Sequence, residues 1–532
     1  MSPARRLLLP ALALAALLCR EAARPGRLLG VPTGEAWGRS FVTNQLGRWL
    51  SGSPLGTADL LGWPGTTPLW PIDPALQLVA LPAELLLGPG QGLVAAAVVI
   101  LTVSGWATGR LALRLGASLP AAAVAGLLVE AAPYLLRNLQ DAVVEAAAIG
   151  FAALAAEQIV AAHQDPGRRA FVRVGLSVLL LSLVSPYYTV YLALGCALAL
   201  PWTARRAWLG IAAASAVACG IALLPLLLAE LGTHGRFASP GGYQLDPGRL
   251  VTADGGPVPR PRLNIAAPGA AWLEPLRRAP GGLALLLSSA AAALLPGGRR
   301  WAGLGAVFFL AGPGVPMLLR AAGVPGVRMD SPLQWLLAVL PVTESLGNPS
   351  RLLAPWILLT AVGFARAASR RPVLLAAVAA VALAEMAAQL PGLKLPSTPA
   401  PTPPAVLAAL SGPTVVFPSG DYPLFHPQVA PKEALFLAGV AQVPIPQDYG
   451  RWRIPADLAL QRALSAASGA PLSERALDLE PPETPAFVSL LVLEDRLTDS
   501  GRERLSAWLT DRGAQPLAAA EGMRAWRLSA PE

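Results

Sequence analysis

Residues 91–109 read QGLVAAAVVILTVSGWATG, an apolar run without a charged residue that ends at Arg110. A helix of about 20 apolar residues is long enough to cross the hydrocarbon core of a bilayer. Comparable runs occupy residues 7–19, 118–136, 142–162, 207–229, 281–297, 301–319, 350–366 and 372–390. Together they predict about nine full spans, and hence an α-helical polytopic membrane protein.

The composition of the chain leads to the same class. Of the 532 residues, 54% are hydrophobic and 14% are charged, whereas about a quarter of the residues of a soluble globular domain are charged. The net charge of +9 comes almost entirely from arginines that stand at the ends of apolar runs. This placement is typical of a protein whose partner is the lipid bilayer, and it argues against a nucleic-acid partner.

The arginine clusters predict the topology, because basic loops remain on the cytoplasmic side. With a cytoplasmic N-terminus, every cluster is cytoplasmic if residues 174–202 leave and return on the same side. This stretch contains Ser185-Pro186-Tyr187-Tyr188, and proline interrupts a helix. We therefore expect a re-entrant pair of half-helices here, with residues 333–342 as a second candidate. The clusters are Arg110 and Arg114; Arg168, Arg169 and Arg173; Arg205 and Arg206; Arg299 and Arg300; and Arg366, Arg370 and Arg371.

The membrane domain is predicted to cover residues 1–390. Arg5 and Arg6 precede the run at 7–19, which favours an uncleaved signal anchor over a cleaved signal peptide. Residues 26–74 would then form a first external loop and 231–280 a second. This topology is that of a protein of the cytoplasmic membrane.

After the last predicted span the chain changes character. Residues 391–410 are rich in proline and predict a stiff linker. Residues 411–532 are predicted to form an α/β domain on the periplasmic or extracellular side. Its expected elements are strands at 414–417, 487–493 and 522–528 and a helix at 500–512.

The first external loop carries the carboxylates Glu35, Asp59 and Asp73 and the arginines Arg39 and Arg48. A carboxylate at the membrane surface can act as a general base, and an arginine can bind a phosphate. The alternative is that these are ordinary solvated charges. Carboxylates of this kind could also hold a divalent metal ion, but no spacing of His, Cys or acidic residues indicates one.

Two further polar groups lie at predicted external ends of spans. Arg137 and Asp141 are four residues apart, and Glu145 continues the same predicted helical face. Asn348 and Arg351 precede another span, where Arg351 could bind a lipid phosphate with two N–H groups or extend to the interface. Charges at such positions are candidates for substrate binding because they are costly to bury. The alternative is a structural charge cluster at the membrane edge.

The order of several short motifs resembles that of a known family. The motifs are Gly34-Glu35, Trp49-Leu50-Ser51-Gly52-Ser53-Pro54, Gly62-Trp63-Pro64-Gly65, Pro133-Tyr134-Leu135-Leu136, Ser185-Pro186-Tyr187-Tyr188, Gly312-Pro313-Gly314 and Gly347-Asn348-Pro349-Ser350-Arg351. Over residues 5–390 this order is similar to that of bacterial multi-pass proteins of the GT-C glycosyltransferase superfamily, chiefly members with a C-terminal external domain. Thr414-Val415-Val416-Phe417-Pro418 also resembles a strand of such domains.

The resemblance implies transfer of a sugar from a polyprenyl-phosphate carrier to an acceptor outside the membrane. The family's general base is usually an aspartate after the first span, and Glu35 corresponds to it with one extra methylene. Arg351 and Arg39 would then stabilise the phosphate leaving group. The competing interpretation is a non-enzymatic transporter or assembly scaffold for lipid-linked glycans or envelope components. That interpretation predicts that the loop carboxylates are dispensable.

Overall fold

The fold is known from a computed structural model of the chain. It describes residues 3–31, 35–61, 67–71, 73–88, 90–233, 250–251, 282–321, 349–399, 405–420, 429, 433–446, 456–481, 483 and 486–529. Residues 333–342, Asn348 and nearly all of 231–280 therefore lie outside the described residues.

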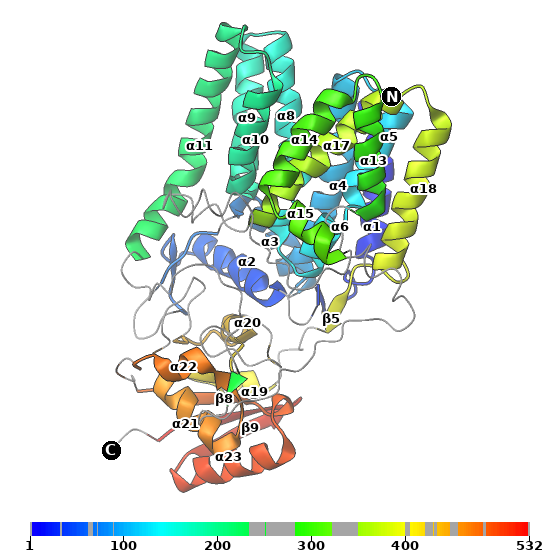
Figure 1. The fold of residues 1–532 in the computed structure, drawn as a ribbon. Helices are drawn as coiled ribbons and strands as arrows, with labels where there is room; N and C mark the ends of the chain where they lie inside the picture. Colours follow the sequence, from blue (N-terminus) through cyan, green and yellow to red (C-terminus); the bar gives the residue numbers. More distant parts are fainter. Residues whose placement is uncertain are drawn as a thin grey trace.

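Each of the nine apolar runs contains a helix (Figure 1). These helices are α1 (Pro3–Cys19), α4 (Gln91–Arg114), α5 (Leu119–Glu130), α8 (Ile149–Gln164), α11 (Arg205–Thr233), α13 (Gly282–Leu294), α14 (Arg299–Ala311), α17 (Leu353–Ala368) and α18 (Pro372–Gln389). Helix α4 packs against α1, α5, α8 and α17. Glycines allow α4 and α5 to approach closely, since a Cβ on Gly126 would lie 2.5 Å from the carbonyl oxygen of Gly105.

The predicted count of nine full spans is not confirmed. Among the described residues, three helical stretches are long and apolar enough to cross a membrane alone: α4, residues 205–225 of α11, and α18. A fourth crossing results if α5 and α6 (Pro133–Gln140), which are bent by 42° at the break between them, count as one span. The remaining helices of the bundle, such as the 13-residue α14, are shorter than 18 residues.

The helix is interrupted at Ser185, as the sequence predicts. Helix α9 (Arg168–Val184) ends there and α10 (Pro186–Ala199) turns back. The end of α10 lies beside the end of α8, from which α9 started, because Nε2 of His163 lies 3.1 Å from the carbonyl oxygen of Pro201. With 17 and 14 residues, α9 and α10 are not shorter than α13 or α14. They form a helical hairpin of ordinary length.

The stretch expected as the first external loop is largely structured. It contains α2 (Ala36–Leu50), and α3 (Pro74–Leu87) follows directly. Short strands flank them: β1 (Arg27–Leu29), β2 (Thr57–Ala58) and β3 (Thr67–Pro68), with β2 and β3 paired. Figure 1 shows α2 lying across the end of the helical bundle, between the bundle and the C-terminal segment.

The residues expected as a linker pack against the N-terminal region. Strand β5 (Ser397–Pro399) pairs antiparallel with β1, and the backbone N–H of Leu395 donates to the carbonyl of Leu18 at 2.8 Å. Described residues 391–399 are therefore not a free spacer. Helix α19 (Ala405–Ala408) begins the C-terminal segment.

The C-terminal segment contains a four-stranded sheet of order β6-β8-β10-β9. Strands β6 and β8 are parallel, and the other neighbours are antiparallel. Alternate residues of β6 and β8 enter two cores: Val415 and Phe417 contact one, Val416 the other. This period of two explains why both strands are buried along their whole length and apolar after their first residue. The bounds are β6 (Thr414–Phe417), β8 (Ser489–Leu493), β9 (Gln515–Ala520) and β10 (Met523–Arg527), with helices α20 (Glu433–Ala441), α21 (Leu458–Ser468) and α23 (Asp499–Asp511).

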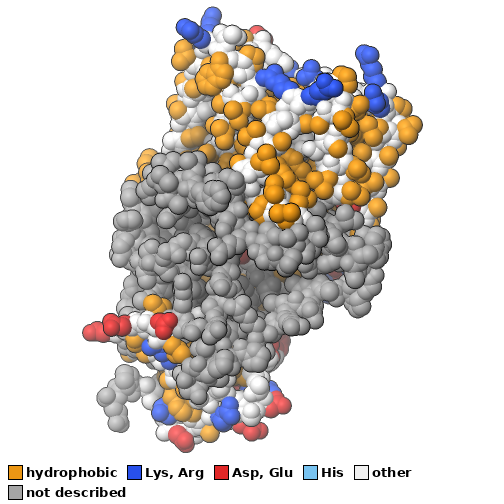
Figure 2. Space-filling view, viewed as in Figure 1, with side chains coloured by type: hydrophobic (Ala, Val, Ile, Leu, Met, Phe, Trp, Pro, Cys, Tyr) orange, Lys and Arg blue, Asp and Glu red, His pale blue; other side chains and the backbone are white. Residues whose placement is uncertain are grey.

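Helix α20 joins the C-terminal segment to α2. The rings of Trp37 and Phe436 pack edge to face, with their centres 4.9 Å apart. The backbone N–H of Ile445, just after α20, donates to the carbonyl of Leu60 at 2.9 Å. The arginine-rich loops lie at the opposite end of the bundle, where Figure 2 shows most of the visible basic side chains of the helical part. The bundle therefore has one arginine-rich end and one end covered by α2 and the sheet.

Candidate functional site

Three buried charged residues and the largely buried Arg351 form a continuous chain at the end of the bundle that α2 covers. Nη1 of Arg39 lies 2.9 Å from Oδ1 of Asp73, and Nη2 of Arg39 pairs with Oε2 of Glu145. Nη2 of Arg351 lies 3.3 Å from Oε1 of the same glutamate. The side chain of Asp73 is fully buried and that of Arg351 is 13% exposed. We call these four residues the buried charge chain.

Two helices of the external layer hold the first half of this chain. Asp73 stands immediately before α3, where Pro74 begins the helix without needing a backbone donor. Gln77 lies one turn further and donates to Oδ1 of Asp73 at 3.1 Å. On α2, Thr43 lies one turn after Arg39 and donates to Oε1 of Gln77 at 2.6 Å. The bonds through Gln77 thus tie α2 to α3 beside the Arg39–Asp73 pair.

Glu145 joins the two halves of the chain. It lies in the one-turn helix α7 (Val144–Ala147). The prediction that it shares a helical face with Arg137 and Asp141 is therefore wrong. Helix α6 ends at Gln140, and Ala142 adopts the left-handed conformation with φ of 57°. This turn directs Glu145 inward between two arginines, whereas Arg137 and Asp141 remain exposed. Pairing is what makes burial of such a carboxylate tolerable.

Arg351 ends the chain beside a layer of tyrosines. It lies in the 3-10 turn η3 (Pro349–Leu352), with its guanidinium carbon 3.7 Å from the centre of the Tyr187 ring. Nη1 of Arg351 is buried and has no hydrogen-bond partner among the described residues. The hydroxyl oxygens of Tyr134 and Tyr188 are 3.4 Å apart, and that of Tyr188 donates to the carbonyl of Ala146. Among the described residues, no acceptor uses Nη1 of Arg351, so this atom can donate a hydrogen bond to a ligand.

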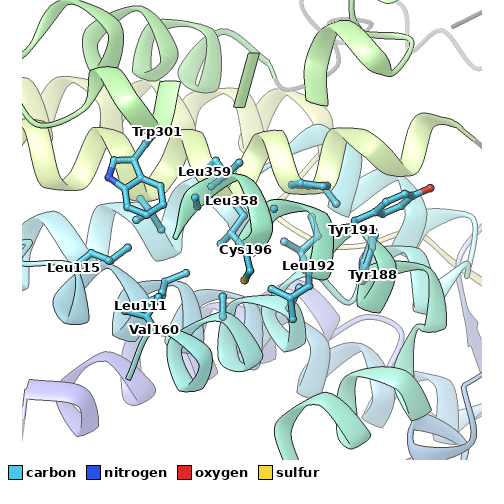
Figure 3. Close-up of a pocket in the computed structure, with 18 of the residues that line it drawn as sticks. Leu111, Leu115, Val160, Tyr188, Tyr191, Leu192, Cys196, Trp301, Leu358 and Leu359 are labelled. Carbon is cyan, nitrogen blue, oxygen red and sulfur yellow. The ribbon is translucent and has the colours of Figure 1, made fainter. Parts of the chain in front are cut away.

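An apolar cavity of about 80 Å³ begins at Tyr188, the neighbour of Tyr187 in the chain. Tyr188 and Tyr191 line one end, and Figure 3 shows the cavity running between α8, α10 and α17 toward Trp301. Leu192 and Leu358 line its middle. A polar end next to a long apolar lining suits a ligand with a charged head and a hydrocarbon tail.

Glu35 lies immediately before α2, four residues ahead of Arg39, and outside the buried charge chain. Its backbone N–H donates to the carbonyl of Asp141 at 2.8 Å, and its side chain is half-buried. Burial raises the pKa of the Asp141 carboxyl, Arg137 lowers it, and the negative charge of Glu35 raises it further. Glu35, Arg137 and Asp141 therefore form a second, more exposed group next to the chain. Glu35 does not line the apolar cavity that begins at Tyr188.

Among the other predicted site residues, Asp59 lies away from this region. Asp59 pairs with Arg48, which also donates to Gln442 of the C-terminal segment, so this pair belongs to the contact with that segment. Among the described residues, no group of three or more His, Cys, Asp or Glu side chains could hold a metal ion. Of the predicted residues, Asp73, Arg39 and Arg351 thus meet in one chain. Glu145 was expected beside Arg137 and Asp141, and no local signal shows that it pairs with both arginines.

Comparison with solved structures places this arrangement in a known fold. The cryo-EM structure of arabinofuranosyltransferase AftD from Mycobacteria superposes with a TM-score of 0.62 and 15% identity over 99% of this chain. The chain spans 40% of the length of that protein. The chain has the GT-C fold. At this identity the similarity concerns the fold alone.

Two other GT-C structures superpose less closely. An oligosaccharyltransferase from Archaeoglobus fulgidus has a TM-score of 0.43 at 12% identity, over 95% of this chain and 71% of that one. ArnT from Cupriavidus metallidurans, in a structure with bound undecaprenyl phosphate, has a TM-score of 0.36 at 13% identity, over 98% and 97%. No protein-family model matches the sequence, and no curated protein does.

Proposed function

We propose that the chain is a glycosyltransferase of the cytoplasmic membrane. It would move a sugar from a polyprenyl-phosphate carrier to an acceptor on the side of the membrane where the C-terminal segment lies. The observation that carries this proposal is that Arg351, whose buried Nη1 has no hydrogen-bond partner among the described residues, lies against Tyr187, while the neighbouring Tyr188 and Tyr191 line an apolar cavity. A polyprenyl phosphate has the matching parts, a single phosphate and a long hydrocarbon chain.

In this proposal Glu35 is the general base. The base must be within reach of the hydroxyl of an incoming acceptor, and Glu35 is only half-buried. Asp73 is fully buried and its Oδ1 already binds Arg39 and Gln77, so it is better suited to positioning. Glu35 would take the hydroxyl proton as the new glycosidic bond forms. The bond between the sugar and the phosphate breaks, and the polyprenyl phosphate leaves with the electron pair.

The buried charge chain would hold the phosphate site in place. Glu145 forms an ion pair with each of the two arginines, and Asp73 forms a second ion pair with Arg39. Arg351 therefore has a partner that fixes its orientation, and its Nη1, which no described residue binds, can donate to a phosphate oxygen. Donors fixed in advance stabilise a leaving group without reorganising during the reaction. Arg137 and Asp141, beside Glu35, would contact the acceptor or the sugar.

A transfer assay on the purified chain tests the proposal. The chain is reconstituted with a panel of labelled polyprenyl-phosphate sugars and candidate acceptors, and the variant Glu35→Gln is compared with Asp59→Asn. Both changes remove one loop carboxylate, but Asp59 pairs with Arg48 away from the chain. We expect Glu35→Gln, and not Asp59→Asn, to lower the rate of transfer by about 10²–10⁴. Full activity in Glu35→Gln would remove Glu35 as the base, and no transfer by the unmodified chain across the panel would favour the scaffold alternative.

A further inference from the structure

A second pocket lies at the arginine-rich end of the bundle, far along α4 from the tyrosine layer. It has a volume of about 440 Å³ and is formed by α4, α8 and α9. Arg110 and Arg114 come from the last turns of α4, and Arg173 comes from the start of α9. We call it the arginine-lined pocket.

The described residues do not balance the charges of this pocket. Arg110 pairs with Glu157 at 2.9 Å and lies over the ring of Trp106 at 4.6 Å. Arg114 and Arg173 are exposed, and they make no hydrogen bond or ion pair with any described residue. With three arginines and one glutamate, the lining has an excess positive charge that suits an anionic group.

The rest of the lining consists of three leucines and the uncharged polar residues Gln158 and Ser177. Leu176 and Leu180 lie one and two turns beyond Arg173 on α9, and Leu154 faces them from α8. Leu176 is 61% exposed. A soluble anion gains nothing from these leucines, whereas a phospholipid can place its phosphate at the arginines and its acyl chains along them. Basic pockets between helices at the edge of the bilayer bind anionic lipids in this way.

We propose that the arginine-lined pocket binds the phosphate of an anionic phospholipid such as phosphatidylglycerol. The site is distinct from the buried charge chain, because the two share no residue and no helix: the pocket is formed by α4, α8 and α9, and the chain by residues of α2, α7 and η3 and by Asp73. The inference depends on the helices lying in a bilayer and does not depend on sugar transfer. Failure of the transfer assay would leave it unaffected.

Native mass spectrometry of the purified full chain tests the binding. The chain is titrated with phosphatidylglycerol or phosphatidylcholine, and the variant Arg114→Gln/Arg173→Gln is compared with Arg205→Gln/Arg206→Gln. The control pair is exposed at the same end of the bundle but does not line the pocket. We expect about fivefold weaker phosphatidylglycerol binding per pocket arginine, so about 25-fold for the pair, with little change in the control.

Two further arms identify the ligand. Leu176→Asn should weaken phosphatidylglycerol binding, and millimolar inorganic phosphate should not displace the lipid. Displacement by phosphate together with unchanged binding to Leu176→Asn would show a site for a free anion and overturn the proposal. Equal binding of phosphatidylcholine, or equal losses in the pocket and control variants, would also overturn it. The single variants Arg114→Gln and Arg173→Gln repeat the test with less change to the protein.

Discussion

The two ends of the helical bundle handle charge in opposite ways. At the end covered by α2, Asp73, Arg39, Glu145 and Arg351 are buried and paired. At the other end, arginines such as Arg114 and Arg173 are exposed and have no partner among the described residues. Burying a charge requires a partner that compensates for lost hydration, whereas an exposed charge needs none. The paired end can therefore support a fixed geometry, and the exposed end can serve orientation and lipid contact.

Breaking the buried charge chain at its centre should have the largest effect. Arg39→Met leaves the carboxylates of Asp73 and Glu145 buried with reduced compensation, which typically costs about 3–5 kcal/mol. We expect the variant to melt far below the unmodified chain in detergent or to fail to accumulate. The control, Arg299→Met at the exposed end, should melt normally. Equal melting of both variants would show that the chain of charges does not stabilise the fold.

Glu35→Gln should separate function from stability. Glu35 is half-buried and lies outside the buried charge chain, so the melting temperature of the variant should differ little from that of the unmodified protein. If Glu35 is the base, transfer should fall by about 10²–10⁴. Rate and melting are measured on the same preparation, with Asp59→Asn as the control acid. A variant that loses activity only in proportion to its folded fraction would assign Glu35 a structural role.

Arg351→Lys tests the phosphate contact with a smaller change. Lysine keeps the charge but loses the planar fork that reaches both Glu145 and a phosphate. One charged hydrogen bond contributes about 1.5–3 kcal/mol, so transfer should fall by about 10- to 100-fold. Kinetics with a polyprenyl-phosphate sugar give the result, and Arg299→Lys at the opposite end is the control. Unchanged kinetics would place the phosphate elsewhere.

The exposed end should show the smallest effects on stability. Arg299→Gln removes a charge whose side chain is exposed, and such changes typically alter stability by less than about 0.5 kcal/mol. Thermal melting in neutral detergent should therefore not distinguish this variant from the unmodified chain. A loss comparable to that of Arg39→Met would remove the contrast between the two ends.

Local patterns predicted much of the fold. Each apolar run contains a helix, because a segment that is apolar over its whole length can bury its backbone only as a helix in a bilayer. The interruption at Ser185-Pro186 and the strands β6, β8 and β10 also follow from nearby residues. The stretch 26–74 was predicted poorly. It contains many glycines and prolines, and α2 is only weakly amphipathic, so its helix depends on packing between the bundle and α20.

By itself the sequence determined the helical membrane class, the arginine-rich end and the list of candidate charges. Each of these depends on residues within one run or at its ends. Only the tertiary structure decided which charges meet. Arg39 and Arg351 are far apart in the chain, and Glu145 reaches them because Ala142 turns the backbone away from the face of Arg137 and Asp141. Pairing between distant charges is selected by the cost of burying them alone, and that cost appears only when the helices have packed.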